Sequence, residues 1–185
     1  SGYVSPTTAQ HVFDGLHDKI PYILDGGACG VGVESTIVGW NEEGEIELYR
    51  LGGIAVEQLE AVIGKKIKHH KKISDNPSAP GQLKSHYATH TPLYLGKIDE
   101  LLPTFTGKNI VLINFKHYYS DLLIEQQFIL SVNGSTDEAA KNLFRVLREA
   151  DSLNADVILA ELLPEEGLGR AVNDRLERAQ HSMKS

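Results

Sequence analysis

STDEAAKNLFRVLREADSLNADVILA, residues 135–160, is the stretch that decides the fold. Ser135 or Thr136 can cap a helix with an acidic first turn, and the apolar residues that follow repeat at helical spacing up to Ala150. The short apolar run that follows at residues 156–160 is typical of a buried strand. An amphipathic helix that leads directly into a buried strand predicts an α/β unit.

The sequence around this stretch repeats the same alternation. Short apolar runs bounded by turn residues predict strands at 91–95, 109–114 and 128–132, and a last helix is predicted at 168–179. Strands that alternate with helices imply a parallel sheet with right-handed crossovers, in a small Rossmann-like domain. Because no G-x-G-x-x-G lies between a strand and a helix, dinucleotide binding is not expected.

The N-terminal block carries the residues whose side chains or backbone could bind a ligand. Residues 5–9, SPTTA, place hydroxyls at the start of a short predicted helix, 9–16, where they can cap the helix or lie beside a bound anion. A strand at 22–24 leads into the glycine-rich run 25–36, whose backbone can approach a ligand closely but which lacks the lysine of a Walker loop. Two further strands are predicted, 35–40 and 45–50. Arg50 ends the second, where it can grip phosphate or carboxylate, or form a surface salt bridge.

The composition sets the domain count and limits the functional classes. At 185 residues, the chain can hold one domain or two. The change in residue composition along the chain predicts blocks at 1–64 and 92–185 joined by a linker at 65–91. A formal net charge of −7 argues against broad nucleic-acid binding, so any RNA contact would be local, for example at the basic run 65–72. The single cysteine and the lack of a long apolar run predict a cytoplasmic protein with no membrane span.

The order of the motifs resembles one family over nearly the whole chain. SGYVSPTTAQHV, LDGGACGVGVESTIV, LYRLGGI, GQLKSHYATHTPLYL, EAAKNLFRVLREADSLNADVILAE and EEGLGRAVNDRLERA resemble successive motifs of the Sua5 branch of the Sua5/YrdC/YciO family. The resemblance implies an L-threonylcarbamoyladenylate synthase, which combines L-threonine, bicarbonate and ATP and releases pyrophosphate. The product serves the modification of adenosine 37 in certain tRNAs. The implied architecture is part of a YrdC-like α/β domain, a linker and a Sua5 domain.

The resemblance also implies site residues in this chain. The implied contacts to ATP are Ser1, Ser5, Thr7, Arg50, His86 and Tyr87, and those to L-threonine are Ser35 and Thr36. No side chain is expected to act as nucleophile, because the chemistry asks for positioning and charge neutralisation. Mg²⁺ is expected to arrive with ATP, bound mainly through substrate oxygens. The linker is expected to act as a lid over the cleft, with Thr89 in place of the family's usual proline.

The family's catalytic domain begins well before the Ser-Gly that stands here at Ser1 and Gly2. The expectation is therefore a C-terminal fragment that makes no threonylcarbamoyl-adenylate alone. Residues 92–185 are expected to fold independently. Residues 1–64 are expected to show weaker protection from hydrogen exchange.

Other interpretations remain open from the residues. The chain could be a tRNA- or protein-binding module without catalysis that uses its Lys/His run. It could also be a hydrolase that uses Cys29 with His11, although no orienting acid is evident. A zinc site at His86 and His90 is disfavoured because two ligands are too few.

Overall fold

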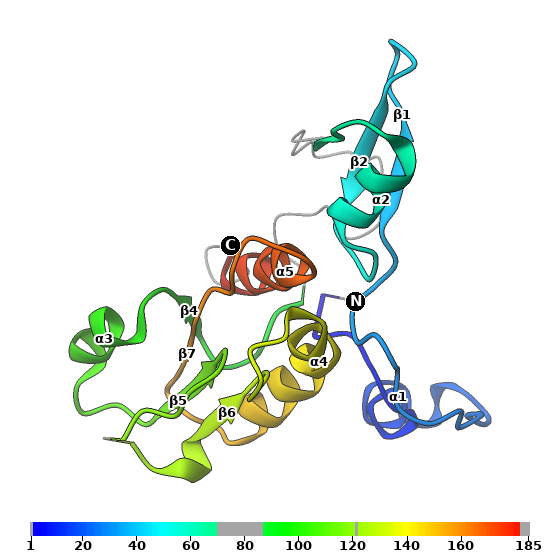
Figure 1. Ribbon diagram of the computed structural model, residues 1–185. Helices are drawn as coiled ribbons and strands as arrows, with labels where there is room; N and C mark the ends of the chain where they lie inside the picture. Colours follow the sequence, from blue (N-terminus) through cyan, green and yellow to red (C-terminus); the bar gives the residue numbers. More distant parts are fainter. Residues whose placement is uncertain (1, 70–86, 121, 182–185) are drawn as a thin grey trace.

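A computed structural model of the chain describes residues 2–69, 87–120 and 122–181. A small sheet and an extended arm formed by the N-terminal block lie beside a larger α/β layer formed by the C-terminal block (Figure 1). Among the described residues, no helix has both the length and the apolar character needed to cross a membrane.

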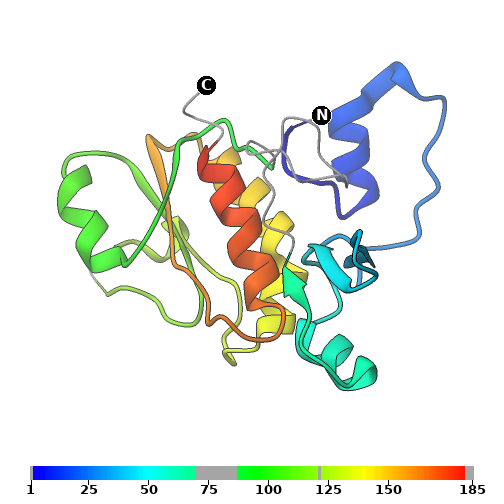
Figure 2. The ribbon, with the colours of Figure 1, turned by 90° about the horizontal axis from the view of Figure 1, so that it is seen from above.

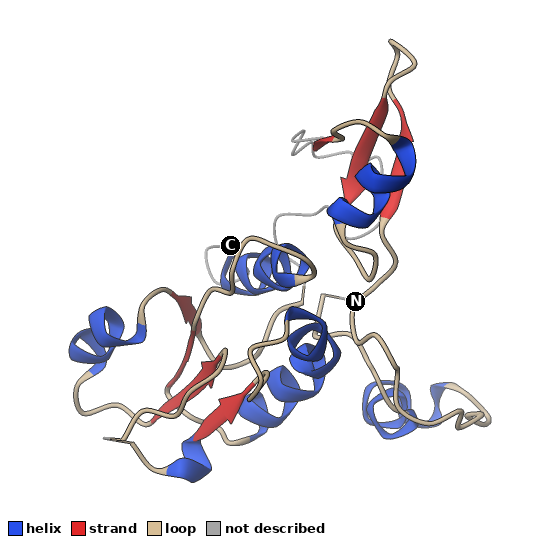
Figure 3. Ribbon diagram, viewed as in Figure 1, coloured by secondary structure: helices blue, strands red, loops and turns tan. Residues whose placement is uncertain are grey.

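The C-terminal layer is built on a four-stranded parallel sheet. Its strands lie in the order β4-β7-β5-β6, and each neighbouring pair is parallel. Helices α4 and α5 lie side by side across one face (Figure 2), while the short helix α3 and the 3-10 turn η2 cover the other (Figures 1 and 3). The bounds are β4 Leu93–Leu95, α3 Ile98–Leu101, η2 Leu102–Phe105, β5 Ile110–Asn114, η3 Ile124–Gln126, β6 Gln127–Ile129, α4 Thr136–Ser152, β7 Val157–Ala160 and α5 Gly169–His181. The predicted parallel α/β domain is confirmed.

Strand β5 shows why this sheet needs helices on both faces. All five of its residues are buried, and alternate side chains point to opposite sides of a strand. Val111 and Ile113 pack in the cluster under α4 and α5, whereas Ile110 and Leu112 pack in the cluster under α3. A strand that is apolar on both faces is typical of a central parallel strand, which is what the unbroken run at 110–113 encodes.

Helix α4 begins at the cap that the sequence predicts. The Ser135 hydroxyl accepts a hydrogen bond from the backbone N–H of Glu138 at 3.3 Å. Its apolar face, which includes Leu143, Phe144 and Leu147, is completely buried. Capping and burial therefore act on the same helix, and both follow from the local pattern.

The N-terminal block forms a hairpin and two helices, and a third short strand comes from the start of the predicted linker. β1 and β2 are antiparallel, β3 joins β2 in parallel, and the sheet order is β1-β2-β3. The bounds are α1 Ala9–Leu16, the 3-10 turn η1 His17–Lys19, β1 Ile37–Trp40, β2 Ile46–Arg50, α2 Val56–Ile63 and β3 Lys68–His69. The predicted helix at 9–16 and the predicted hairpin are confirmed.

Some local assignments differ from the sequence prediction. The strand predicted at 22–24 is wrong: these residues are irregular, with 77% of Tyr22 and 91% of Leu24 exposed. Apolar residues without a neighbouring strand cannot complete a backbone ladder. Helix α2 was not predicted, although Val56, Leu59 and Ile63 have helical spacing and Gly64 ends the helix with φ 76°.

The main core crosses the predicted domain boundaries at 64 and 91. Val4 and Tyr87 are buried in the cluster formed by α4, α5 and the C-terminal sheet. The backbone of Tyr3 also forms a parallel bridge with Ala88. Independent folding of residues 92–185 stays a prediction, but in this structure side chains from outside that range, including Val4 and Tyr87, complete its core.

Candidate functional site

The loop before β1 and the loop after β2 lie against each other. The Gly53 N–H donates to the Glu34 carbonyl at 2.9 Å. The Thr36 hydroxyl donates to the Ile54 carbonyl and accepts from the Ile54 N–H, both at 2.9 Å. These three bonds fix residues 34–36, which carry the predicted L-threonine contacts, against residues 53–54.

Gly52 allows this close approach. A Cβ on Gly52 would lie 2.4 Å from the Glu34 carbonyl oxygen and equally close to two further backbone atoms of residues 35 and 36. Backbone atoms at that distance cannot be accommodated without moving one of the loops. The glycine is therefore required by packing, not by a left-handed φ.

Replacing Gly52 with alanine is expected to separate these loops and to lower the free energy of unfolding by about 1–3 kcal/mol, the usual cost of overpacking. L-threonine affinity is expected to fall with it. Chemical denaturation and titration calorimetry measure both effects. Gly30→Ala is the matched control, because a Cβ there meets nothing within 4 Å. Equal behaviour of the two variants would contradict the packing of the loops.

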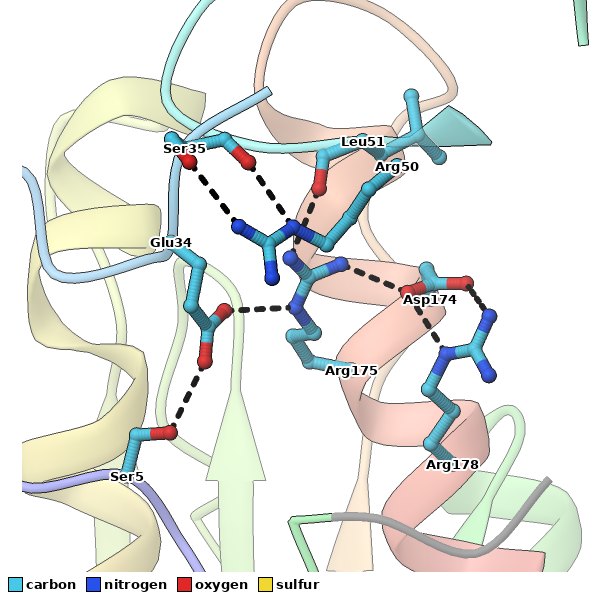
Figure 4. A network of polar contacts seen from close by, with 8 residues as sticks. All are labelled: Ser5, Glu34, Ser35, Arg50, Leu51, Asp174, Arg175 and Arg178. Carbon is cyan, nitrogen blue, oxygen red and sulfur yellow. Dashed lines mark hydrogen bonds and ion pairs between the residues drawn. The ribbon is translucent and has the colours of Figure 1, made fainter. Parts of the chain in front are cut away.

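Arg50 is held beside Ser35 by two hydrogen bonds. Its Nε donates to the Ser35 carbonyl and its Nη2 to the Ser35 hydroxyl, each at 3.0 Å. Ile37 is the register partner of Arg50, with a bulge between Ile37 and Val38. The irregular start of β1 lets the arginine turn back onto Ser35, two residues before the strand. Two predicted contacts, one for phosphate and one for L-threonine, thus lie side by side (Figure 4).

Glu34 connects this pair of loops to the rest of the protein. Its Oε1 accepts a hydrogen bond from the Ser5 hydroxyl at 2.9 Å, and its Oε2 accepts from Arg175 Nε at 3.1 Å. The Arg175 side chain has no exposed surface. Its Nη2 also donates to the Leu51 carbonyl at 2.7 Å, and its Nη1 to Asp174 at 2.7 Å (Figure 4).

The environment of Glu34 favours its charged form. Burial alone would raise the pKa of this carboxyl, but the Arg175 charge and hydrogen bonds from its own backbone, Ser5 and Arg175 outweigh burial. The pKa of Glu34 therefore lies below its usual value of 4.5. Burial would likewise lower the pKa of Arg175, but Tyr87, Asp174 and Glu34 together raise it. The two groups form an ion pair at neutral pH.

This pKa shift predicts a pH dependence of stability. A carboxyl with a lowered folded-state pKa contributes stability that is complete above the usual value of 4.5 and is lost as the pH falls through the folded-state pKa. The difference in unfolding free energy between the wild type and Glu34→Gln should therefore be constant down to about pH 5 and shrink below it. Denaturant titrations at stepped pH measure it, with Glu42→Gln on the exposed hairpin turn as control. A difference that stays constant to pH 3 would contradict the paired carboxylate.

A second polar cluster fastens the N-terminal segment to the end of α4. Asp151 accepts hydrogen bonds from the Tyr3 hydroxyl at 2.9 Å, from His90 Nδ1 at 2.8 Å and from the Thr91 N–H at 2.8 Å. Arg148 lies over the Tyr3 ring, 4.8 Å from its centroid, and also donates to the carbonyls of residues 4 and 5. Burial and the Asp151 carboxylate raise the pKa of Tyr3 to about 12. This cluster sets the path of the chain that leads to Ser5.

The structure gathers four of the predicted site residues at the two loops. Ser5, Ser35, Thr36 and Arg50 surround Glu34 or the loops beside it. Ser1 and His86 lie outside the described residues. The remaining two are buried. Thr7 has other partners, whereas Tyr87 lies against Arg175 with Glu34 close to its hydroxyl.

Thr7 is directed to α1. Its hydroxyl lies 3.2 Å from His11 Nδ1, and its carbonyl accepts from the Cys29 N–H at 2.9 Å. Thr8, which was not singled out, is the residue that caps α1. His11 thus faces Thr7, while Cys29 is an exposed free thiol. This arrangement gives no support to a Cys29–His11 pair.

Tyr87 lies in the core. Its ring is 1% exposed, stacks on Phe144 with centroids 5.3 Å apart, and carries the Arg175 guanidinium 5.3 Å above it. Its backbone has a φ of 63°, which is unusual for a residue with a side chain. A nucleotide contact through this ring stays a prediction, and it requires the ring to leave the position seen here.

Glu34, Gly52 and Arg175 were missed by sequence reasoning. Arg175 left a signal, since it lies among the apolar positions 172, 176 and 179 of α5 and so interrupts a buried stripe. Glu34 directly precedes the two predicted L-threonine contacts, but nothing in its neighbours indicates a buried partner. Its ion-pair partner lies 141 residues away.

A cavity of about 410 Å³ lies between β2, α2 and α5, and no predicted substrate contact lines it. Its polar lining is largely occupied by internal pairs such as Arg170–Glu57 and Lys66–Glu60. Within residues 2–69, 87–120 and 122–181, no cluster of three or more His, Cys, Asp or Glu side chains could hold a metal ion. We therefore centre the candidate site on the paired loops rather than on this cavity.

Comparisons with known proteins match both parts of the chain. Residues 54–180 match the family described as "Threonylcarbamoyl-AMP synthase, C-terminal domain", and residues 1–52 match the family described as "Telomere recombination". These matches meet next to Gly52, whereas the sequence predicted boundaries at 64 and 91.

Relatives and solved structures agree with these matches. A threonylcarbamoyl-AMP synthase of Pyrococcus abyssi is 37% identical over 193 residues, covering 97% of this chain and 55% of the relative. That of Bacillus subtilis is 33% identical over 189 residues, with 97% and 54% covered. A crystal structure of Pyrococcus abyssi Sua5 complexed with L-threonine superposes with a TM-score of 0.83 at 37% identity, covering 98% of this chain and 56% of that one. The chain spans about half the length of these relatives.

Proposed function

The chain belongs to the threonylcarbamoyl-AMP synthase family, and from this premise we propose that it forms part of an L-threonylcarbamoyladenylate synthase. The substrates would be L-threonine, bicarbonate and MgATP, and the products L-threonylcarbamoyladenylate and pyrophosphate. The product would supply the threonylcarbamoyl group for adenosine 37 of tRNA. We propose a cytoplasmic location for this role, together with the tRNAs that would finally receive the group.

The reaction has two bond-forming steps. The L-threonine nitrogen attacks the carbon of bicarbonate, and loss of water leaves a carbamate. A carbamate oxygen then attacks the α-phosphorus of ATP, the bond from this phosphorus to the bridging oxygen breaks, and pyrophosphate leaves. Neither step needs a protein nucleophile, since both depend on positioning and on neutralising phosphate charge.

The observation that carries the proposal is the pairing of Arg50 with Ser35. The two hydrogen bonds orient the guanidinium beside residues 35 and 36. A phosphate is a stronger partner than a neutral hydroxyl for this group, because both sides of the hydrogen bond are then charged. L-threonine at Ser35 and Thr36 and a phosphate at Arg50 would therefore lie next to each other. The L-threonine complex of the Pyrococcus abyssi relative supports the choice of amino acid.

The Ser5 hydroxyl extends the same site. It donates to Glu34, directly before Ser35, so the N-terminal segment reaches the loop that we assign to L-threonine. The carboxylate of Glu34 is neutralised by Arg175 and is not a ligand for the substrate in this proposal. Its function is to join the segments that carry Ser5 and Ser35.

A complementation experiment tests the proposal. The chain is mixed with a polypeptide carrying the part of the Pyrococcus abyssi relative that the match leaves uncovered, or joined to it in one chain. We call both the complemented sample. With L-threonine, bicarbonate and MgATP, it should release pyrophosphate and form L-threonylcarbamoyladenylate, whereas each polypeptide alone should not.

Omission of L-threonine or bicarbonate is the control for the reaction. Product from the mixture or from the fused chain supports the proposal. Failure of both formats to form product and to bind L-threonine would overturn it.

A further inference from the structure

Arg175 is a fully buried arginine in the middle of α5. Its neighbours on the helix face are the buried apolar residues Val172, Leu176 and Ala179. Taking a guanidinium out of water is costly, and an apolar side chain of similar size at such a position is often equally stable or more so. A simple need for stability therefore does not explain an arginine here.

The partners of Arg175 share one property. It binds Glu34, which directly precedes Ser35, and the Leu51 carbonyl, which directly follows Arg50. The third acceptor, Asp174, lies on the same helix and is also bound by Arg178. Through one planar group, α5 thus touches both loops of the candidate site one residue away from the proposed substrate contacts (Figure 4).

Aromatic rings hold the Arg175 guanidinium in position. Tyr87 packs under it, and the Tyr87 ring in turn stacks on Phe144 of α4. Burial and the nearby Glu34 charge raise the pKa of the Tyr87 hydroxyl, while the Arg175 charge opposes this shift. Because the fork of an arginine is planar and rigid, its orientation sets the distance between the acceptors that it joins.

We infer that Arg175 is a positioning residue of the proposed synthase: from the C-terminal domain, it sets the spacing between Ser35 and Arg50 without touching substrate. This inference rests on the proposed function for its catalytic consequence. Its structural part, which does not depend on the function, is that α5 determines the position of the Arg50 guanidinium. The C-terminal domain would then contribute to catalysis through the two loops.

A set of variants separates positioning from stability. Arg175→Met removes the charge and leaves Glu34 buried without its ion-pair partner, so the unfolding midpoint should fall. Arg175→Met combined with Glu34→Gln removes both charges, and the midpoint should return toward the wild type. If Arg175 only stabilises the fold, the activity of the double variant should return together with its stability. A positioning role predicts that it does not, because neither new side chain restores the bond to the Leu51 carbonyl.

Activity is measured in the complemented sample. We expect kcat/KM for the double variant to stay about 100-fold below the wild type, because misplacing a substrate contact by roughly 1 Å can cause a loss of this size. Arg175→Lys keeps the charge without the fork and should also stay at least 10-fold low. Arg178→Met is the control: it removes another arginine bond to Asp174 on the same helix and should retain wild-type kcat/KM. Wild-type kcat/KM in the double variant or in Arg175→Lys would overturn the inference.

A second readout needs no activity. The Arg50 Nε–H resonance in ¹H–¹⁵N spectra of the chain reports the bond to Ser35. It should shift in Arg175→Lys and in the double variant, and stay in place in Arg178→Met. If the wild-type complemented sample makes no product, the proposed function fails, and this resonance still decides on Arg175. An unchanged resonance in a folded Arg175→Lys variant would refute the positioning role.

Discussion

Replacing Arg50 with alanine is expected to lower kcat/KM for ATP by about 100-fold in the complemented sample, equal to ~2.7 kcal/mol of transition-state stabilisation. The guanidinium that would neutralise phosphate charge is lost, and Ser35 loses the two bonds that hold it. The KM for L-threonine should therefore rise as well, but less. Initial rates at varied ATP and at varied L-threonine measure the two effects.

Arg50→Lys separates the charge of Arg50 from its geometry. A lysine keeps the charge but lacks the planar fork, so it should recover only part of the loss in ATP use. Arg145→Ala is the matched control, since Arg145 forms an exposed pair with Glu149 on α4, far along the chain from both loops. Equal losses for ATP and L-threonine would show that Arg50 acts only through Ser35, and no loss for either would exclude it from the site.

Tyr87→Ala is expected to lower the free energy of unfolding by about 3–5 kcal/mol, the usual cost of truncating a large buried aromatic side chain. The change removes the ring between Phe144 and Arg175. Tyr87→Phe keeps the ring and should remain much closer to the wild type. Tyr87→Gly should be no worse than Tyr87→Ala, because glycine adopts the φ of 63° without strain. Denaturant unfolding of the four proteins measures these differences.

The same variants test the predicted lid. If Tyr87 covers the cleft during the reaction, Tyr87→Ala should raise the ratio of pyrophosphate released to L-threonylcarbamoyladenylate formed, because water then reaches the intermediate. An unchanged ratio with lowered stability would limit Tyr87 to its packing role. Unchanged stability would contradict the buried ring seen here.

Local signals in the sequence determined the fold of the C-terminal domain. The serine cap, the amphipathic run and the apolar strand between 135 and 160 fixed α4 and β7, because capping and periodicity act between neighbours in the chain. Where such signals lacked a tertiary partner, the prediction failed. Residues 22–24 have the composition of a strand, but the structure leaves them irregular and exposed.

The candidate site divides in the same way. The residues themselves indicated an anion-binding or salt-bridge role for Arg50, and the family resemblance implied Ser35 and Thr36. Only the tertiary structure brought Glu34 to Arg175, across 141 residues, and buried Tyr87 beneath that arginine. Burial and charge pairing depend on which distant segments meet, and a local pattern does not encode that meeting. For this reason the sequence predicted which residues could bind substrate, and the fold decided what holds them in place.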